Sequence, residues 1–223
     1  ETHSSGKLWD LTTGQVVRHF QFKGDQISFS ADSRLLLVED GNASLRDVFT
    51  GEEVRRIDGR NPMFLPGSQQ VATSDDHNLY VSDARTGRRL RTFAGRSSFP
   101  EATTTSEHFA DFSPDGRFGL TRSDSDPWLV SALYDLKTGG VRVTKNEVEV
   151  NLAAVAFSSD NRSFLVTTQA FPDGGGGGDV CLHGLPQGET IRCYEGLNNS
   201  VTAAALTPDN RFVVASGAGG ITN

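Results

Sequence analysis

The sequence predicts an all-β fold built from repeated four-stranded antiparallel units. Two short turn patterns recur along the 223 residues, they alternate in strict order, and strand-like stretches flank every copy. The chain has 24 glycines and a single methionine, a composition that indicates many tight turns and few long helices. Its length suits one domain with one sizeable core.

The first turn pattern consists of an apolar residue, a turn and a basic or amide residue. Its copies are FSADSR (29–34), FLPGSQ (64–69), FSPDGR (112–117), FSSDNR (157–162) and LTPDNR (206–211). Gly and Asn tolerate a positive φ, and Asp bonds back to its own backbone, so these sequences favour tight turns. Apolar, small-residue stretches such as ISFS and RLLLVED surround each copy, so each copy predicts a β-hairpin.

The second turn pattern combines an aspartate with a glycine four residues later. Its copies are LWDLTTG (8–14), LRDVFTG (45–51), VSDARTG (81–87), LYDLKTG (133–139) and the degenerate LHGLPQG (182–188). A further strand-like stretch follows each glycine, for example QVVRHFQF or ETIRCY. These copies therefore predict a second set of hairpins.

Interleaving the two hairpins gives four strands per repeat. A four-stranded unit that recurs about every 40 to 50 residues is typical of the blades of a β-propeller. We expect four whole blades and a partial blade at each end. The expected boundaries are a partial blade at 1–24, whole blades at about 25–59, 60–95, 96–147 and 148–196, and a partial blade at 197–223.

The chain resembles the WD40-repeat β-propeller family over essentially its whole length. The resemblance rests on the third strand of each repeat, and its signature residues are Trp9, Asp10, Asp47, Asp83, Tyr134 and Asp135. Members of that family usually carry a Gly-His pair before the first strand of a blade. This chain has Gly24-Asp25, Gly59-Arg60, Gly95-Arg96 and Gly196-Leu197 instead. We therefore expect a divergent member without the buried Asp-His network of the family.

The number of blades in the complete ring stays open. One alternative is a closed five-bladed ring in which the opening stretch completes the last blade. The other is a segment of a larger, often seven-bladed, propeller. The second is favoured because GGITN near the end aligns with SGKLWD near the start, so both claim the same strand position.

Three long insertions point to a binding surface. They are RSSFPEATTTSEHF (96–109), SDSDPWLVSA (123–132) and TQAFPDGGGGGD (168–179). In a four-stranded antiparallel unit, the connections between second and third strands and between consecutive units lie at one end of the strands, and the tight turns lie at the other end. We therefore expect all three insertions on one face. Long loops on a rigid scaffold often carry binding function.

The inserted segments combine exposed aromatic residues with acids and few bases. The candidate binding residues are Phe99, Glu101, Asp124, Asp126, Trp128, Phe171, Asp173 and Asp179. Glu107 is a further acid in the same segments. They predict an acidic patch with aromatic residues that binds a basic peptide or protein segment. The alternative is neutral variation of loop length in a tolerant scaffold. The Gly174–Gly178 run is expected to be a flexible linker, not a phosphate or calcium loop.

No motif of a known enzyme class occurs, so we expect no catalytic residues, no metal ligands and no cofactor. The WD40 resemblance implies a non-catalytic scaffold for protein–protein interaction. The alternatives are an enzyme or small-ligand binder that uses the central channel, and a sensor domain of a longer effector polypeptide. The inward first strands are mostly apolar and small, as in LAAVAF and VTAAAL, which favours the scaffold.

Charge and hydropathy bear on partners and compartment. The formal charge of −7 argues against nucleic acid as the main partner. No apolar run is long enough to span a membrane and no secretory leader opens the chain, so the cytoplasm is favoured. Cys181 and Cys193 are expected nearly opposite one another on adjacent strands, either as a disulfide or as free thiols.

Overall fold

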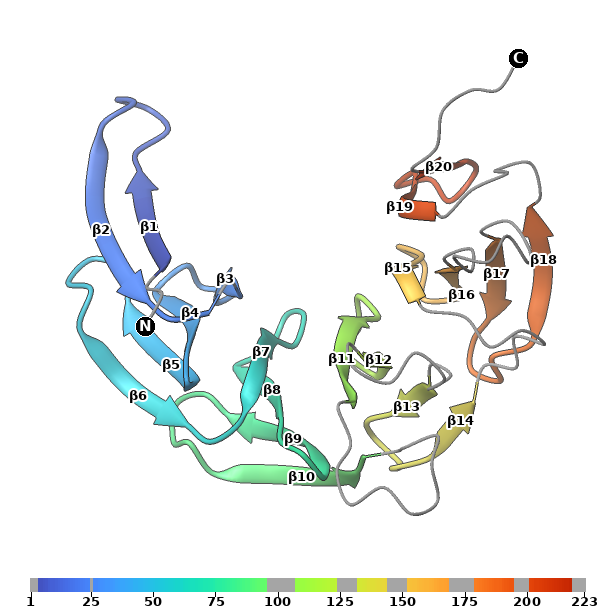
Figure 1. Cartoon of the computed structure of the whole chain (residues 1–223), viewed down its shortest axis with the longest axis horizontal. Helices are drawn as coiled ribbons and strands as arrows, with labels where there is room; N and C mark the ends of the chain where they lie inside the picture. The colour runs from blue at the N-terminus through green and yellow to red at the C-terminus, as the bar shows by residue number, and fades with distance from the viewer. Residues whose placement is uncertain are drawn as a thin grey trace, which may run out of the picture. The chain divides into compact units, whose positions relative to one another are not determined.

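The computed structural model describes residues 4–24, 26–95, 107–123, 132–143, 152–168, 179–194 and 201–217. Every regular element in these ranges is a β-strand (Figure 1). The chain divides into two compact units, residues 1–95 and residues 96–223. Within the described ranges no helix is long and apolar enough to cross a membrane.

The first unit contains one two-stranded and two four-stranded antiparallel sheets. The two-stranded sheet consists of β1 (Ser4–Trp9) and β2 (Val16–Phe22). The next sheet consists of β3 (Ile27–Phe29), β4 (Leu35–Asp40), β5 (Asn42–Asp47) and β6 (Glu53–Ile57). The third consists of β7 (Arg60–Phe64), β8 (Gln70–Ser74), β9 (Asn78–Asp83) and β10 (Arg89–Ala94).

The second unit repeats this organisation in a different order. Its first sheet consists of β11 (Glu107–Phe112), β12 (Phe118–Ser123), β13 (Ala132–Asp135) and β14 (Val141–Val143). The next consists of β15 (Leu152–Phe157), β16 (Ser163–Thr168), β17 (Val180–Gly184) and β18 (Thr190–Tyr194). A two-stranded sheet of β19 (Val201–Leu206) and β20 (Val213–Gly217) follows.

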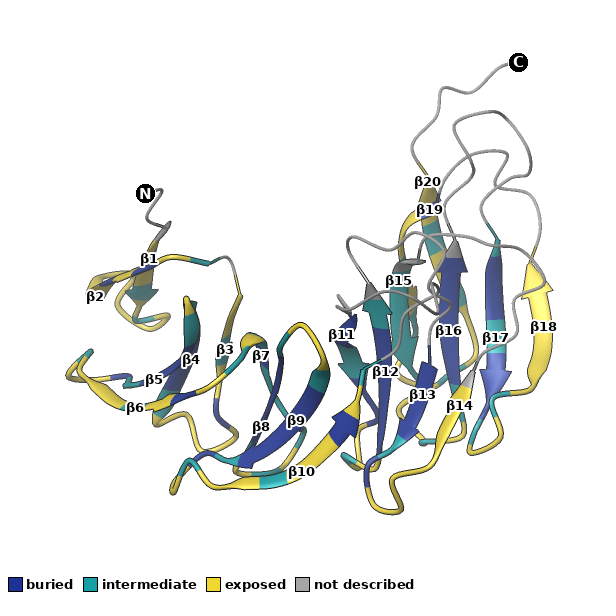
Figure 2. Ribbon diagram, turned by 60° about the horizontal axis from the view of Figure 1, so that its bottom comes forward, coloured by how far each residue is buried: buried dark blue, intermediate teal, exposed yellow. Residues whose placement is uncertain are grey.

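Neighbours in the chain are neighbours in every sheet, so each four-stranded sheet is a simple meander. Burial is concentrated on the second and third strands. The described side chains of β8 and β9 are nearly all buried, whereas every residue of the fourth strand β18 is exposed (Figure 2). The expected all-β fold with four-stranded antiparallel repeat units is confirmed.

Apolar side chains between adjacent sheets form the cores of the two units. In the first unit one core lies between the β1–β2 and β3–β6 sheets, and a second between the β3–β6 and β7–β10 sheets. In the second unit Leu120, Leu133, Phe164 and Val166 pack between the β11–β14 and β15–β18 sheets. A further cluster with Leu165, Val180 and Val201 connects the latter sheet with β19.

The first turn pattern closes the hairpins of the first and second strands through local side-chain bonds. In four of its five copies a hydroxyl donates to the aspartate two residues later, at 2.5 to 2.7 Å. The same aspartate accepts a hydrogen bond from the backbone N–H two residues further on. The hydroxyl of Ser158, followed by the backbone N–H of Arg162, holds the pKa of Asp160 below its ordinary value.

The second turn pattern closes the hairpins of the third and fourth strands. The signature aspartates Asp10, Asp47, Asp83 and Asp135 each accept bonds from backbone N–H groups two or three residues later. In all five copies the closing glycine donates to the backbone carbonyl four residues earlier at 2.8 Å and has a φ between 70° and 80°. A glycine is favoured there because a side chain would strain this left-handed conformation.

Candidate binding end of the second unit

The two ends of the four-stranded sheets in the second unit differ. One end, named here the turn end, carries the tight turns between first and second and between third and fourth strands. The other, the loop end, is where β11, β13, β15 and β17 begin. Asn161 Oδ1 accepts a hydrogen bond at 3.0 Å from the backbone N–H of Asp115, which joins the turn ends of the two sheets. Their loop ends therefore lie on a common side.

The three long segments predicted from the sequence attach at this loop end. They enter β11, connect β12 to β13 and connect β16 to β17. Asp179 is described, lies directly before β17 and is partly buried. The remaining candidate residues, Phe99, Glu101, Asp124, Asp126, Trp128, Phe171 and Asp173, lie outside the described residues.

Glu107 is a structural residue and not an exposed loop acid, so that part of the sequence expectation is wrong. It is the first residue of β11 and is only 1% exposed. Its carboxyl oxygens accept hydrogen bonds from Thr121 Oγ1 at 2.5 Å and from the Tyr134 hydroxyl at 3.2 Å. The register of the strands places all three side chains on one face of the sheet.

These three side chains form a buried polar network in the β11–β14 sheet. Thr121 is 0% exposed and its hydroxyl also accepts from the backbone N–H of Ala132 at 3.3 Å. The rings of Tyr134 and Phe109 are nearly perpendicular, with centroids 5.8 Å apart. A satisfied buried network holds strands in one register, so the network fixes the starts of β11 and β13 at the loop end.

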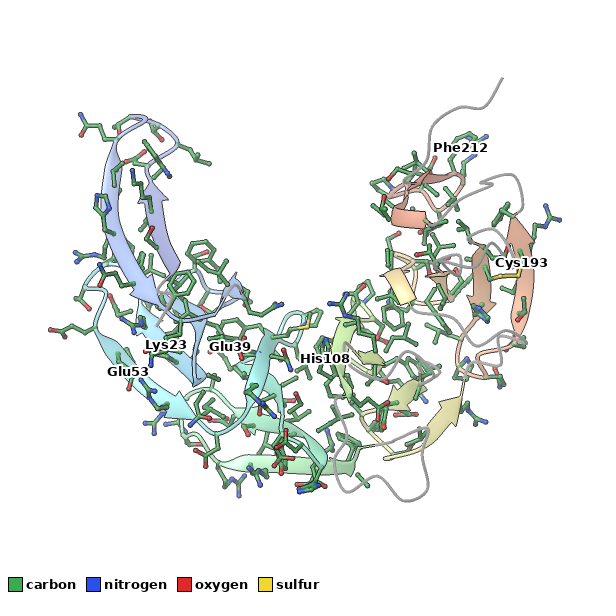
Figure 3. The ribbon with its side chains drawn as sticks, in the orientation of Figure 1. Lys23, Glu39, Glu53, His108, Cys193 and Phe212 are labelled. Atoms are coloured by element: carbon green, nitrogen blue, oxygen red, sulfur yellow. A yellow bond between two sulfur atoms is a disulfide. The ribbon has the colours of Figure 1, made fainter. Side chains whose placement is uncertain are left out.

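A second polar pair lies beside this network. Arg122 Nε donates to His108 Nε2 at 3.3 Å, and His108 is 6% exposed (Figure 3). Further along β11, the carboxyl group of Asp111 accepts from the backbone N–H of Phe157 in β15 at 3.3 Å. Burial raises the pKa of Asp111, against the lowering effect of its bonds from Phe112 and Phe157. Asp111 thus joins the first strands of two sheets.

The other signature and turn residues have structural roles. Tyr134 is fully buried, whereas Trp9, which lies in the two-stranded β1–β2 sheet, is 52% exposed. In the turn before β9, Asp75 Oδ1 accepts hydrogen bonds from the backbone N–H groups of His77 and Asn78, so these residues form the turn. Within the described ranges, no three or more His, Cys, Asp or Glu residues are arranged to hold a metal ion.

A groove of about 500 Å³ lies on the β19–β20 sheet next to β17 and β18. Its apolar wall includes Val180, Leu182, Leu206 and Val213. Phe212, which also lines it, is 61% exposed. Sequence reasoning did not identify this groove, because it is formed by side chains of five different strands.

Cys181 and Cys193 form a disulfide between β17 and β18 (Figure 3). The two residues are directly opposite in the register, with Cα atoms 4.0 Å apart. The structure thus contains the bridged form, one of the two alternatives that the sequence left open.

Comparison with known proteins adds no family or relative to these observations. No family model matches the sequence, and no curated protein matches it closely enough to count as a relative.

Proposed function

We propose that this chain is part of a WD40-type β-propeller that acts as a non-catalytic scaffold for protein–protein interaction. Its four-stranded sheets correspond to the blades. The partner is a protein or peptide segment with net positive charge, and it binds at the loop end of the second unit.

The observation that carries this proposal is the buried network of Glu107, Thr121 and Tyr134. The network orders the starts of β11 and β13, into which two of the inserted segments lead. Such a rigid base lowers the entropy cost of binding through the attached loops. Of the eight candidate residues in the three insertions, five are acids and three are aromatic. Aromatic residues contribute strongly to the binding energy of interfaces, and acids favour a basic partner.

The proposal is tested with peptides selected on the purified chain. A random displayed peptide library is enriched against the wild-type protein, and the affinities of the selected peptides are measured by calorimetry. We expect peptides with net positive charge whose binding weakens with salt. The double substitution Trp128→Ala and Phe171→Ala should weaken it at least tenfold, the size of a typical hot-spot loss of about 1.4 kcal/mol or more.

Phe49 provides the matched control, because it is an aromatic residue that is 68% exposed in a tight turn of the first unit. Phe49→Ala should leave the affinity unchanged. Equal binding to the wild type and the double variant would contradict a role of the loop end. Selection of acidic or neutral peptides would contradict the proposed charge of the partner.

A further inference from the structure

The fourth strands carry an arginine at a repeated position. It occurs as Arg18 in β2, Arg55 in β6, Arg142 in β14 and Arg192 in β18, opposite a leucine of the third strand in each register. Arg18, Arg55 and Arg142 are each followed by a described four-stranded sheet with a closing glycine, so these three can be compared directly. Differences in their surroundings then reflect the neighbouring sheet.

In the first unit this arginine covers the closing glycine of the next sheet. A Cβ atom placed on Gly51 would lie 2.9 Å from Arg18 Cδ, and one placed on Gly87 would lie 3.2 Å from Arg55 Cδ. Arg18 also lies close enough to Asp47 to contribute to the lowered pKa of that carboxyl, after the larger effect of its bond from the Thr50 N–H. The arginine thus fills the space above the turn.

Arg142 does not make this contact. The atom nearest to a Cβ placed on Gly188, the corresponding glycine, is Leu133 Cδ2 at 4.0 Å. Arg142 instead lines a pocket of about 230 Å³ between the β11–β14 sheet and the turn at Pro186. Its guanidinium group has no hydrogen bond or ion pair with any residue that the structure describes.

The pocket has an excess of positive charge. Arg117 also lines it, and its Nη2 pairs with Asp135 Oδ2 at 3.0 Å while its guanidinium lies 4.7 Å from the Phe118 ring centroid. The charged groups in the lining are therefore two guanidinium groups and one carboxylate. Thr138 adds a hydroxyl to the same wall.

The excess of positive charge arises next to the degenerate copy of the second turn pattern, at residues 182–188. The other four copies have an aspartate at the first position of the turn, and the fifth has Gly184. The Glu189 carboxylate lies against Gly184, in the space where an aspartate side chain would begin. Glu189 is not part of the pocket wall and no ion pair joins it to Arg142.

We propose that this pocket binds a carboxylate group, held by Arg117 and Arg142. Two arginines in the wall of one pocket suit a carboxylate, because a guanidinium group can donate two parallel hydrogen bonds to its oxygens. The pocket volume admits a small dicarboxylate or the acidic side chain of a peptide. This site lies at the turn end and is independent of the loop-end function proposed above.

Malonate and a short glutamate-containing peptide with blocked ends are the probes. Binding is followed by the ¹⁵N shift of the arginine Nε groups and by calorimetry of the whole chain, in low-salt buffer. We expect saturable binding that shifts the Arg142 resonance. Arg142→Gln should raise the dissociation constant at least tenfold, whereas the matched control Arg55→Gln should leave it unchanged. Binding of malonate alone identifies a small-molecule site, and binding of the peptide identifies a site for acidic side chains.

Gly184→Asp tests the origin of the charge excess. It restores the missing acid within the chain and should abolish the binding of both probes. If Arg142→Gln is poorly folded, Arg142→Lys replaces it and should give an intermediate loss of affinity. Unchanged malonate affinity in Arg142→Gln or Arg142→Lys would overturn the proposal. So would an equal response to chloride at the same ionic strength, since that indicates screening without a specific site.

Discussion

The imidazole of His183 stacks on the ring of Phe164, with centroids 5.2 Å apart and 15° between the planes. His183 is 0% exposed, at the repeat position that Tyr134 and Trp9 occupy in other sheets. Its Nδ1 is 3.2 Å from the carbonyl oxygen of Gly188, while its buried Nε2 has no hydrogen-bond partner among the residues that the structure describes. Burial, only partly offset by that carbonyl, lowers the pKa of His183 below its ordinary value of 6.5.

This lowered pKa predicts a loss of stability in mild acid. Well above pH 6.5 the imidazole is neutral in both the folded and unfolded chain, so its contribution to stability is complete. Below that pH the unfolded chain binds the proton first, so the free energy of unfolding falls by up to about 1.4 kcal/mol per pH unit until the folded pKa is reached. His183→Phe keeps the stack and removes the titrating group.

Urea unfolding between pH 7.5 and pH 5 measures this effect. The difference in unfolding free energy between wild type and His183→Phe should grow in favour of the variant as the pH falls. His19, which is exposed on β2, serves as the control, and His19→Phe should follow the wild-type profile. Parallel profiles for the wild type and His183→Phe would show that His183 protonates normally in the folded chain.

The buried carboxyl group of Glu107 makes a second prediction. Thr121→Val removes the hydroxyl that lies 2.5 Å from it and leaves a polar group in the interior with one partner fewer. The expected loss is about 1 to 3 kcal/mol of unfolding free energy. Thr73→Val is the matched control, because Thr73 has the same position in β8 but donates to the backbone carbonyl of Asp58 at 2.9 Å.

Chemical denaturation should show a larger loss for Thr121→Val than for Thr73→Val. Tyr134→Phe should cost about 1 kcal/mol, and its combination with Thr121→Val should depart from additivity because both residues bond one carboxyl group. Strict additivity would mean that the three side chains do not act as a network.

The Cys181–Cys193 disulfide predicts a stability that depends on reductant. A bridge that closes a loop of this size contributes about 3 kcal/mol in the chain-entropy model. Reduction should lower the midpoint of urea unfolding of the wild type, and should not affect a variant with both cysteines changed to alanine. Mass spectrometry should find the non-reduced chain lighter by two hydrogens. A purified chain with two reactive thiols would contradict the bridge.

Sequence reasoning succeeded for the hairpins because both turn patterns are closed by local interactions. Asp135 bonds to N–H groups only two and three residues away, and Ser113 bonds to Asp115 in the same turn. Such contacts are contained within one short motif. Together with the strand-like stretches around them, they predict the antiparallel sheets and their order.

The interactions that sequence reasoning missed connect residues far apart in the chain. Glu107 bonds to residues 14 and 27 positions later, so its burial could not be deduced from the acidic loop sequence around it. The pocket at Arg142 was missed for a similar reason, because Arg142 differs from Arg18 and Arg55 only in what it contacts in space. The degenerate turn at Gly184 was the one signal in the sequence that pointed there.

The bond between Asn161 and Asp115 makes a last prediction, about how neighbouring sheets are joined. Asn161 has a φ of 57°, and its Oδ1 accepts the N–H of Asp115 at 3.0 Å. The next pair repeats the device, since Asn210 also has a φ of 57° and accepts the N–H of Ser159 at 3.0 Å. In both cases the side-chain oxygen of an asparagine with a left-handed backbone conformation joins two neighbouring sheets, at the turns that connect their first and second strands.

Two substitutions at Asn161 separate the effect of this bond from that of backbone strain. Asn161→Gly tolerates the positive φ but loses the bond, which should cost about 0.5 to 1.5 kcal/mol of unfolding free energy. Asn161→Ala loses the bond and adds the strain, so it should be less stable than the glycine variant by about 1 kcal/mol. If thermal and urea unfolding give the glycine variant wild-type stability, the bond between the turns contributes nothing, and the two sheets are held together by the apolar core and the Asp111–Phe157 bond.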